Sequence, residues 1–257
     1  MNGKLKAFAV VCAIAVMAGC AAVAQTPEVK EKPPLYSYIG FWAIPRAQWA
    51  DMEKSTAADE KVLSKALAGG TIVGYGNDVN LVHQPDGPTH DDWWSAMSMA
   101  GLLNVLEQFY QSGGTTVPVL GTATRHWDNI YVSRYYNWRP GTIKNGYTYV
   151  AQYQLKAGAA DNAVETLSKS LVVPLLEQQL AAGNIQEYEV DTEAVHSDAP
   201  GMFLIVYIAN SAEGLDKVNA ARVEALKASP LASPGFGSMV DVSAHRDYLS
   251  RTNATYK

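Results

Sequence analysis

The sequence predicts an α+β fold built from two tandem copies of one βαββαβ unit. Three observations lead to this prediction. The chain matches itself at an offset of 113 residues, and strand-like and helix-like segments follow in the same order in both copies. The composition, 48% hydrophobic and 18% charged, is that of a globular protein with a sizeable core. We place the two copies at residues 35–140 and 146–250.

The internal match runs without a gap over residues 36–107. Within it, 18 of 72 positions are identical to the residue 113 positions later. Roughly four to six identities are expected by chance at this composition, so we interpret the match as a tandem duplication. The identical pairs include Ile72 with Ile185, Tyr75 with Tyr188, Asp78 with Asp191, His83 with His196, and Gly101 with Gly214.

The first copy begins with a strand rich in aromatic and branched residues, and the proline that follows opens a helix. Paired glycines end both of its helices, Ser98 caps the second, and Pro85-Asp86-Gly87 predicts a tight turn. The expected elements are a strand at 35–44, a helix at 45–68, strands at 71–83 and 92–97, a helix at 98–112 and a last strand at 117–126.

The second copy repeats this order. The expected elements are a strand at 147–155, a helix at 161–180, strands at 184–196 and 202–209, a helix at 211–227 and a last strand at 238–245. Pro174 lies inside the first of these helices, where the missing N–H and the ring clash predict a kink or a break.

A βαββαβ unit is the ferredoxin-like arrangement. Two such units in one chain resemble the dimeric α+β-barrel superfamily, in which two ferredoxin-like units pack their sheets into one barrel. Members include antibiotic-biosynthesis-type monooxygenases, chlorite-dismutase-like haem proteins and small stress-responsive proteins. The resemblance covers residues 35–250 and rests on topology and duplication. It implies a single-chain pseudo-dimer whose bare apolar sheet faces cover each other.

Residues 1–24 are typical of an export signal, with Lys4 and Lys6 ahead of an uncharged apolar run that is too short to span a bilayer. Two processing routes are open. The small residues at 22–24 fit signal-peptidase cleavage before Gln25, whereas residues 17–20 resemble a lipobox that ends a lipoprotein signal at 19 and lipidates Cys20. Residues 25–34 form a proline-rich tether. We expect periplasmic or extracellular export, with or without a membrane anchor.

Removal of this leader leaves 18 basic and 25 acidic residues and no cysteine. A surface of net charge −7 repels phosphate backbones, which argues against nucleic acid as a partner. Membrane contact is expected only through a lipid on Cys20. Disulfides and thiolate chemistry are excluded for the mature chain.

A hydroxyl-x-His-x-Asp pattern occurs near the end of both copies. The catalytic candidates are His126, Asp128 and Arg134 in the first copy and His245, Asp247 and Arg251 in the second. An imidazole oriented by a carboxylate could act as a general base or a metal ligand. Alternatively, these duplicated residues could only satisfy backbone groups at the barrel rim. The first reading places them in a cavity beside the tryptophans; the second leaves them in solvent or bonded to the backbone.

The hairpin between the second and third strands offers weaker metal-ligand candidates, His83, His90, Asp91 and Asp92, whose spacing matches no defined metal motif. The sequence contains no P-loop, GxGxxG turn, nucleophile elbow or HExxH motif, so no motif indicates a cofactor.

All six tryptophans precede the second copy. One interpretation is a pocket for a planar apolar ligand, with Trp93, Trp94, Trp127 and Arg125 as binding candidates. The other is that tryptophans fill the core. Adjacent strand residues point in opposite directions, so one of Trp93 and Trp94 must face the helices and the other the barrel.

Three functions are consistent with these patterns. The first is an exported protein that binds a small apolar or aromatic ligand or a partner. The second is an enzyme resembling α+β-barrel oxygenases or haem-binding members, which would use the His-x-Asp residues. The third is a structural cell-envelope lipoprotein. The sequence assigns no reaction.

Overall fold

The computed structural model describes residues 28–228 and 232–257 and has the predicted α+β architecture. The strands are β1 (Leu35–Ala43), β2 (Gly74–Asn80), β3 (His90–Ala96), β4 (Arg125–Trp138), β5 (Gly141–Gln154), β6 (Ile185–Glu193), β7 (Met202–Ala209) and β8 (Arg246–Tyr256). The helices are α1 (Trp49–Ala68), α2 (Met99–Ser112), α3 (Ala163–Leu167), α4 (Val173–Ala181), α5 (Ala212–Ala228) and α6 (Ala232–Met239).

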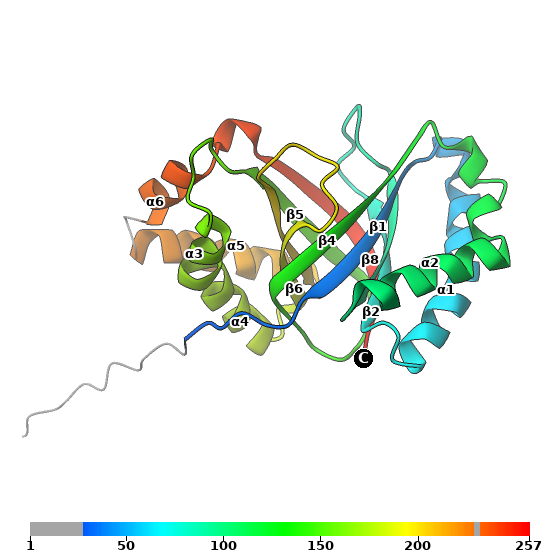
Figure 1. Cartoon of the computed structure of the whole chain (residues 1–257), viewed down its shortest axis with the longest axis horizontal. Coiled ribbons are helices and arrows are strands. Elements are labelled where there is room, and N and C mark those ends of the chain that lie inside the picture. The colour runs from blue at the N-terminus through cyan, green and yellow to red at the C-terminus, as the bar shows by residue number, and fades with distance from the viewer. Residues whose placement is uncertain (1–27, 229–231) are drawn as a thin grey trace, which may run out of the picture.

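The strands form one closed antiparallel barrel in the order β1-β3-β2-β8-β5-β7-β6-β4. The first four strands are contiguous, in the order β4-β1-β3-β2, and the last four follow as β8-β5-β7-β6. Helices α1 and α2 cover the outside of the first group, and α3 to α6 cover the outside of the second, on the opposite side of the barrel (Figure 1). Closure leaves no unpaired sheet edge.

Local sequence signals fix several element ends as expected. Ser98 precedes α2, and its Oγ accepts a hydrogen bond from the Gly101 N–H at 3.1 Å. Gly113 ends α2 with φ +77°, the left-handed conformation that a residue without a Cβ adopts most easily. Strand β7 has the predicted bounds.

The predicted strand at 117–126 is wrong. A 3₁₀ turn at Gly114–Thr116 precedes this segment, a second at Leu120–Thr122 lies within it, and β4 begins only at Arg125. Val119 is buried against Ile44 and Met52, so the apolar residues of this loop cover the end of α1 instead of pairing in the sheet.

The predicted strand at 238–245 is also wrong. Helix α6 ends at Met239, a 3₁₀ turn follows at Val242–Ala244, and the strand begins at Arg246. The inward residues of β8 include Ser250 and Thr252, which are buried although they are polar. This strand therefore lacks the apolar alternation by which a strand is recognised in sequence.

The helix expected at 161–180 is interrupted as predicted. A π-helical turn at Ser168–Val172 separates α3 from α4, and Pro174 lies in the first turn of α4. Proline has no N–H to donate, and a residue in the first turn of a helix does not need one. The wider π-helical turn before it leaves room for the proline ring.

The barrel interior differs from the expected apolar packing. The residues that point inward include five buried carboxyl groups, those of Asp78, Asp91, Glu187, Glu189 and Asp191. Apolar packing lies between the barrel and the helices, at one end of the barrel, where Trp93 contacts Tyr256, and along part of the interior wall, where Tyr131 packs with Leu204.

The predicted leader, its cleavage site and Cys20 lie outside the described residues. None of the helices in the described part of the chain is both long and apolar enough to cross a membrane.

Candidate functional site

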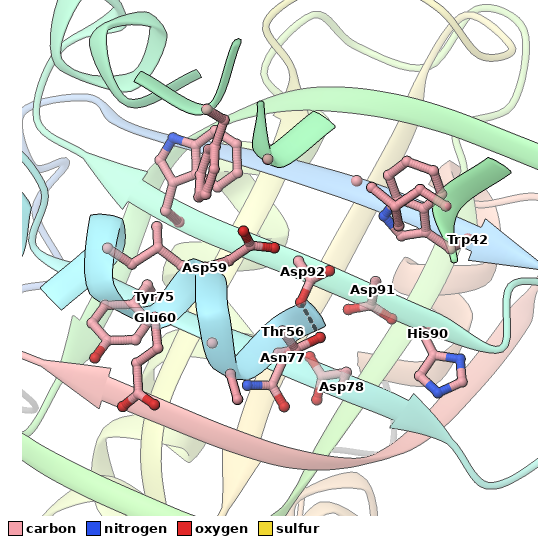
Figure 2. Close-up of a pocket in the computed structure, with 18 of the residues that line it drawn as sticks. Trp42, Thr56, Asp59, Glu60, Tyr75, Asn77, Asp78, His90, Asp91 and Asp92 are labelled. Atoms are coloured by element: carbon pink, nitrogen blue, oxygen red, sulfur yellow. Dashed lines mark hydrogen bonds between the residues drawn. The ribbon is translucent and has the colours of Figure 1, made fainter. Parts of the chain in front are cut away.

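A cavity of about 950 Å³ lies between helices α1 and α2 and the outer face of the first group of strands. Residues of β1, β2, β3 and β4 form its floor, α1 and α2 its sides, and the loop at 114–123 part of its rim. Figure 2 shows the α1 side chains Thr56 and Asp59 facing the strand residue Asp92 across this space. We refer to it as the helix-side cavity.

Aromatic side chains form one wall of the helix-side cavity. The rings of Tyr38 and Trp94 stack at 4.3 Å between centroids, and Phe109 of α2 lies 5.5 Å from Trp94. The Trp94 indole N–H donates to the carbonyl of Leu102 at 3.1 Å, which fixes the ring. Such a wall offers a flat apolar surface for an aromatic ligand.

Two carboxyl groups face each other in this cavity. Burial raises the pKa of Asp92, and repulsion from the nearby Asp59 and Asp78 adds to this effect and brings the pKa to about 7. A hydrogen bond from Thr56 lowers the pKa by a smaller amount. The Thr56 hydroxyl lies 3.5 Å from Oδ1 of Asp92. Burial alone raises the pKa of Asp59 to about 6. A carboxyl group with a pKa near 7 can take up and release protons at neutral pH.

His126 and Asp128 of β4 reach the same cavity. Nε2 of His126 lies 3.4 Å from Oδ2 of Asp128, and the imidazole stacks on Trp42 at 3.6 Å. Nδ1 of His126 donates to the carbonyl of Phe41 at 2.9 Å. Burial and the Asp128 charge raise the pKa of the Tyr38 hydroxyl. This His-x-Asp pair therefore both bonds to the backbone and lines a cavity beside tryptophans.

The second His-x-Asp pair lies on the opposite side of the barrel. His245 and Asp247 are 3.0 Å apart, and the His245 ring stacks on Tyr153 at 4.4 Å. Tyr153 in turn packs edge-on against Phe236 of α6. The local geometry repeats that of the first pair, but neither residue lines the helix-side cavity.

The two candidate arginines do not reach either pair. Arg134 forms an ion pair with Glu31 at 3.1 Å, and Arg251 is exposed on β8. Within the described residues, neither of these two arginines therefore forms a hydrogen bond or ion pair with the His-x-Asp residues of either copy.

The binding candidates separate between two compartments. Trp94 belongs to the wall of the helix-side cavity, whereas Trp93 points into the barrel, as the alternation of a strand requires. Trp127 stacks on Phe41 at 5.3 Å, and the Arg125 guanidinium lies 5.0 Å above Trp127. These last three residues lie at a mouth of the barrel interior.

The metal-ligand candidates do not converge. His83 and His90 each meet the ring of Trp49 edge-on, and burial with the neighbouring His83 lowers the pKa of His90 to about 4. Asp92 faces α1, whereas Asp91 also borders the barrel interior. Among the described residues, no three His, Cys, Asp or Glu side chains lie close enough together to hold a metal ion.

Asp59 was not singled out from the sequence, although a signal for it exists. The buried residues of α1 are Met52, Ser55, Leu63 and Ala66. Asp59 falls between Ser55 and Leu63 at the same helical spacing, so a carboxylate interrupts the buried face of this helix. A charged residue at such a position indicates either a cavity or a buried partner.

No family model matches the sequence, and no curated protein matches it significantly. Solved structures are similar in fold. A candidate monooxygenase from Fusobacterium nucleatum subsp. nucleatum ATCC 25586 has a TM-score of 0.64 and 8% identity, over 88% of this chain and 95% of its own. Another from Lactobacillus acidophilus NCFM has a TM-score of 0.57 and 12% identity, over 87% and 97%.

An anthrone oxidase-like protein has a TM-score of 0.50 and 13% identity, over 88% of this chain and 94% of its own. At these identities the comparison concerns the fold. The similarity in fold agrees with the α+β barrel that the resemblance implies.

Proposed function

We propose that this protein is an enzyme that removes a proton from a flat aromatic substrate in the helix-side cavity and lets the resulting anion react with dioxygen. The observation that carries the proposal is the carboxyl group of Asp92. It has a pKa of about 7 and lies in a cavity walled by aromatic rings. The monooxygenase and anthrone oxidase-like names of the fold neighbours point to the same class of reaction.

Each part of the cavity has a role in this proposal. The Trp94 and Tyr38 rings stack against the substrate and orient it. Asp92 accepts the proton, and Asp59 across the cavity favours retention of that proton because like charges disfavour two ionised carboxylates. His126, held by Asp128 and by the Phe41 carbonyl and stacked on Trp42, supplies a polar ring at the edge of the cavity that helps to position the substrate.

The reaction needs an acidic C–H group beside an aromatic ketone or phenol. Proton transfer to Asp92 leaves a carbanion, which supplies the electrons that reduce dioxygen. A C–O bond forms, the O–O bond breaks, and loss of the second proton completes the ketone. In total, one CH₂ group and one O₂ give one C=O group and one water, so the substrate itself is the reductant.

The charges around the helix-side cavity argue against a haem. Among lysines and arginines, Lys144 lines the cavity. Seven acidic residues also line it: Glu53, Asp59, Glu60, Asp78, Asp91, Asp92 and Asp128. Two haem propionates would meet repulsion from these carboxylates. We therefore derive no step through haem.

Anthrone, a tricyclic ketone with an acidic CH₂ group, tests the proposal. We expect oxygen uptake to match anthraquinone formation one to one, at a rate well above spontaneous oxidation. Asp92→Asn should lower this rate by about 10²–10⁴-fold, the usual contribution of a general base. Asp51→Asn, at an exposed position of α1 outside the cavity lining, is the control and should leave the rate unchanged.

Tight binding of anthrone without turnover would show that the protein binds this compound but does not oxidise it, and would overturn the enzymatic proposal. An Asp92→Asn protein as active as the natural chain would remove Asp92 from the reaction. A Soret band in the purified protein would show that haem binds despite the acidic lining.

We also infer that the barrel arose by duplication of a ferredoxin-like unit. The strand orders β4-β1-β3-β2 and β8-β5-β7-β6 are the same arrangement, which supports two units at 35–140 and 146–250. A Cβ on Gly101 would lie 2.8 Å from the Thr71 carbonyl oxygen, and one on Gly214 would meet the Asn184 carbonyl at the equivalent place. Export through the 1–24 leader, with or without a lipid on Cys20, stays part of the proposal.

A further inference from the structure

The barrel interior holds a second cavity, of about 310 Å³, on the other face of the strands from the helix-side cavity. Its walls carry carboxyl groups from both halves of the chain. Asp78 of β2 and Asp91 of β3 contribute from the first half, and Glu187, Glu189 and Asp191 of β6 from the second. In the closed order of strands, β2 and β6 lie opposite each other, so the two sets face across the barrel.

Neighbouring groups satisfy part of this cluster. Asp78 accepts hydrogen bonds from the Trp93 indole at 3.1 Å and from the Thr148 hydroxyl at 2.8 Å. Glu187 accepts one from the Tyr256 hydroxyl at 2.6 Å, and Glu189 accepts one from Ser37 at 3.1 Å.

Two polar atoms on residues that line this cavity lack a hydrogen-bond partner within the described part of the chain. Oδ1 of Asp191 and Nδ2 of Asn80 have no hydrogen-bond partner among the described residues. Asp191 is 2% exposed and Asn80 is 3% exposed, so bulk water does not reach them freely. An unpaired buried polar atom costs about 1–3 kcal/mol. Oδ1 of Asp191 is an acceptor, so a ligand that brings an N–H donor removes this cost for Asp191.

The lining carries little positive charge to balance these acids. Its basic residue is Arg125 at the mouth, whose side chain is 55% exposed and donates to the carbonyl of Asp86. Burial, with mutual repulsion where carboxyls adjoin, raises the pKa values of the interior acids. The acids must therefore hold protons or meet a cation from solution.

The shape of the cavity favours an elongated cation. Trp93, Tyr256 and Ile208 close one end of the barrel. The other end opens beside the exposed residues Arg125 and Asp198. Apolar residues of the same lining, among them Phe41, Val150, Leu204 and Val206, can contact methylene groups between charged ends.

We propose that the barrel interior is a binding site for a small aliphatic diamine or polyamine. One ammonium group is held between Asp191 and the carboxyls beside it, the methylene chain lies on the apolar wall, and a second ammonium group faces Asp78 and Asp91 across the barrel. This site is separate from the proposed active site, and its occupation does not depend on the oxygenase proposal.

Isothermal titration calorimetry of the full chain with 1,4-diaminobutane and with spermidine tests the site. We expect saturable binding of one molecule per chain, with protons released into the buffer because the ammonium groups displace them from the carboxyls. Asp191→Asn and Glu189→Gln should each weaken binding at least 10-fold. n-Butylamine, which has a single charge, should bind much more weakly.

Asp51→Asn is the control, because it removes an exposed carboxyl that lines neither cavity, and it should leave diamine binding unchanged. Thermal melts test whether Asp191→Asn and Glu189→Gln fold normally. Each variant removes a buried acid, so its melting temperature should be no lower than that of the natural chain. Absence of saturable binding would overturn the proposal, as would equal weakening by Asp51→Asn. Tighter binding of Ca²⁺ or Mg²⁺ alone, lost in the same variants, would make the site a metal site instead.

Discussion

Asp51, Asp92 and Asp128 have one side-chain chemistry and three environments. Asp51 is exposed and pairs with Lys54 at 2.7 Å, whereas Asp128 lies at the edge of the helix-side cavity beside His126. Asp92 is partly buried near two other carboxyl groups, which raises its pKa to about 7. Position in the fold therefore gives Asp92 a carboxyl group that can exchange protons near neutral pH.

The pKa of Asp92 sets the expected pH dependence of turnover. A general base must be deprotonated, so the rate should be low at pH 5, rise with an apparent pKa near 7 and level off above pH 8. Asp59→Asn removes the charge that repels the Asp92 carboxylate most strongly and should move this apparent pKa downward. Steady-state rates of anthrone oxidation at constant ionic strength measure both effects, and a pH-independent rate would contradict the assignment.

The two histidines of the repeated pattern allow a matched comparison. His126→Ala should slow turnover by about 10–100-fold, because it removes a polar group from the cavity, whereas His245→Ala should leave turnover unchanged. Each variant loses one stacked ring pair, a stability cost of about 0.5–1.5 kcal/mol. Urea denaturation and anthrone turnover separate the two effects. Equal losses of turnover in both variants would refute a role specific to the first copy.

At the scale of elements, the close contact between each second helix and the preceding turn fixes the helix position. Gly101 of α2 and Gly214 of α5 allow the helix backbone to approach the carbonyl groups of Thr71 and Asn184. Ser98 and Ser211 each accept a hydrogen bond from the glycine three residues later. Serine, glycine and carbonyl therefore form the same local arrangement in both halves.

Replacement of either glycine by alanine should destabilise the protein. The added methyl group would overlap a backbone carbonyl that cannot move aside, and such overpacking costs about 1–3 kcal/mol. Gly121→Ala, where a Cβ meets nothing within 4 Å, is the control and should change stability by less than about 0.5 kcal/mol. Urea denaturation midpoints measure the differences. Unchanged midpoints for Gly101→Ala and Gly214→Ala would show that these helices can shift.

The elements that sequence patterns identified are those with an apolar face toward the helices. Helices α1, α2 and α5 and strand β7 lie close to their expected bounds. The two last strands, β4 and β8, were misplaced. Both begin late, and their inward faces include polar residues such as Asn129 and Ser250. Hydrophobic alternation cannot mark a strand whose buried side is polar.

At the scale of the whole molecule, the buried acids determine how stability depends on pH. The interior carboxyls have pKa values above those of the unfolded chain, so the folded state binds more protons than the unfolded state. Their contribution to stability is therefore most favourable below the unfolded pKa values, near pH 4, and declines as pH rises through the folded values.

We accordingly expect the free energy of unfolding to fall between pH 5 and pH 8, the reverse of the usual acid denaturation. Chemical denaturation at fixed ionic strength across this range measures the slope. Asp191→Asn removes one of these carboxyls and should flatten the slope. A stability that rises toward pH 8 would contradict this account of the barrel interior.

Closure of the barrel explains why one face of each strand group is so unlike the other. The outer faces pack on helices largely through apolar and aromatic side chains, whereas the inner faces combine an apolar wall with buried acids in a narrow space. Two chemically different cavities therefore occur on opposite faces of the same strands.

The sequence by itself determined the α+β class, the order of most elements and the opposite directions of Trp93 and Trp94, because these depend on periodicity and on local turn chemistry. It also singled out His126, Asp128 and Asp92, but as members of separate motifs. Only the tertiary structure decided that these residues share one cavity with Asp59, and that Arg134 and His245 lie elsewhere. Only the tertiary structure likewise decided that the acids of β2, β3 and β6 face one another inside the barrel. Distances between residues far apart in the chain, and the burial that shifts their pKa values, arise only when the strands close into a barrel.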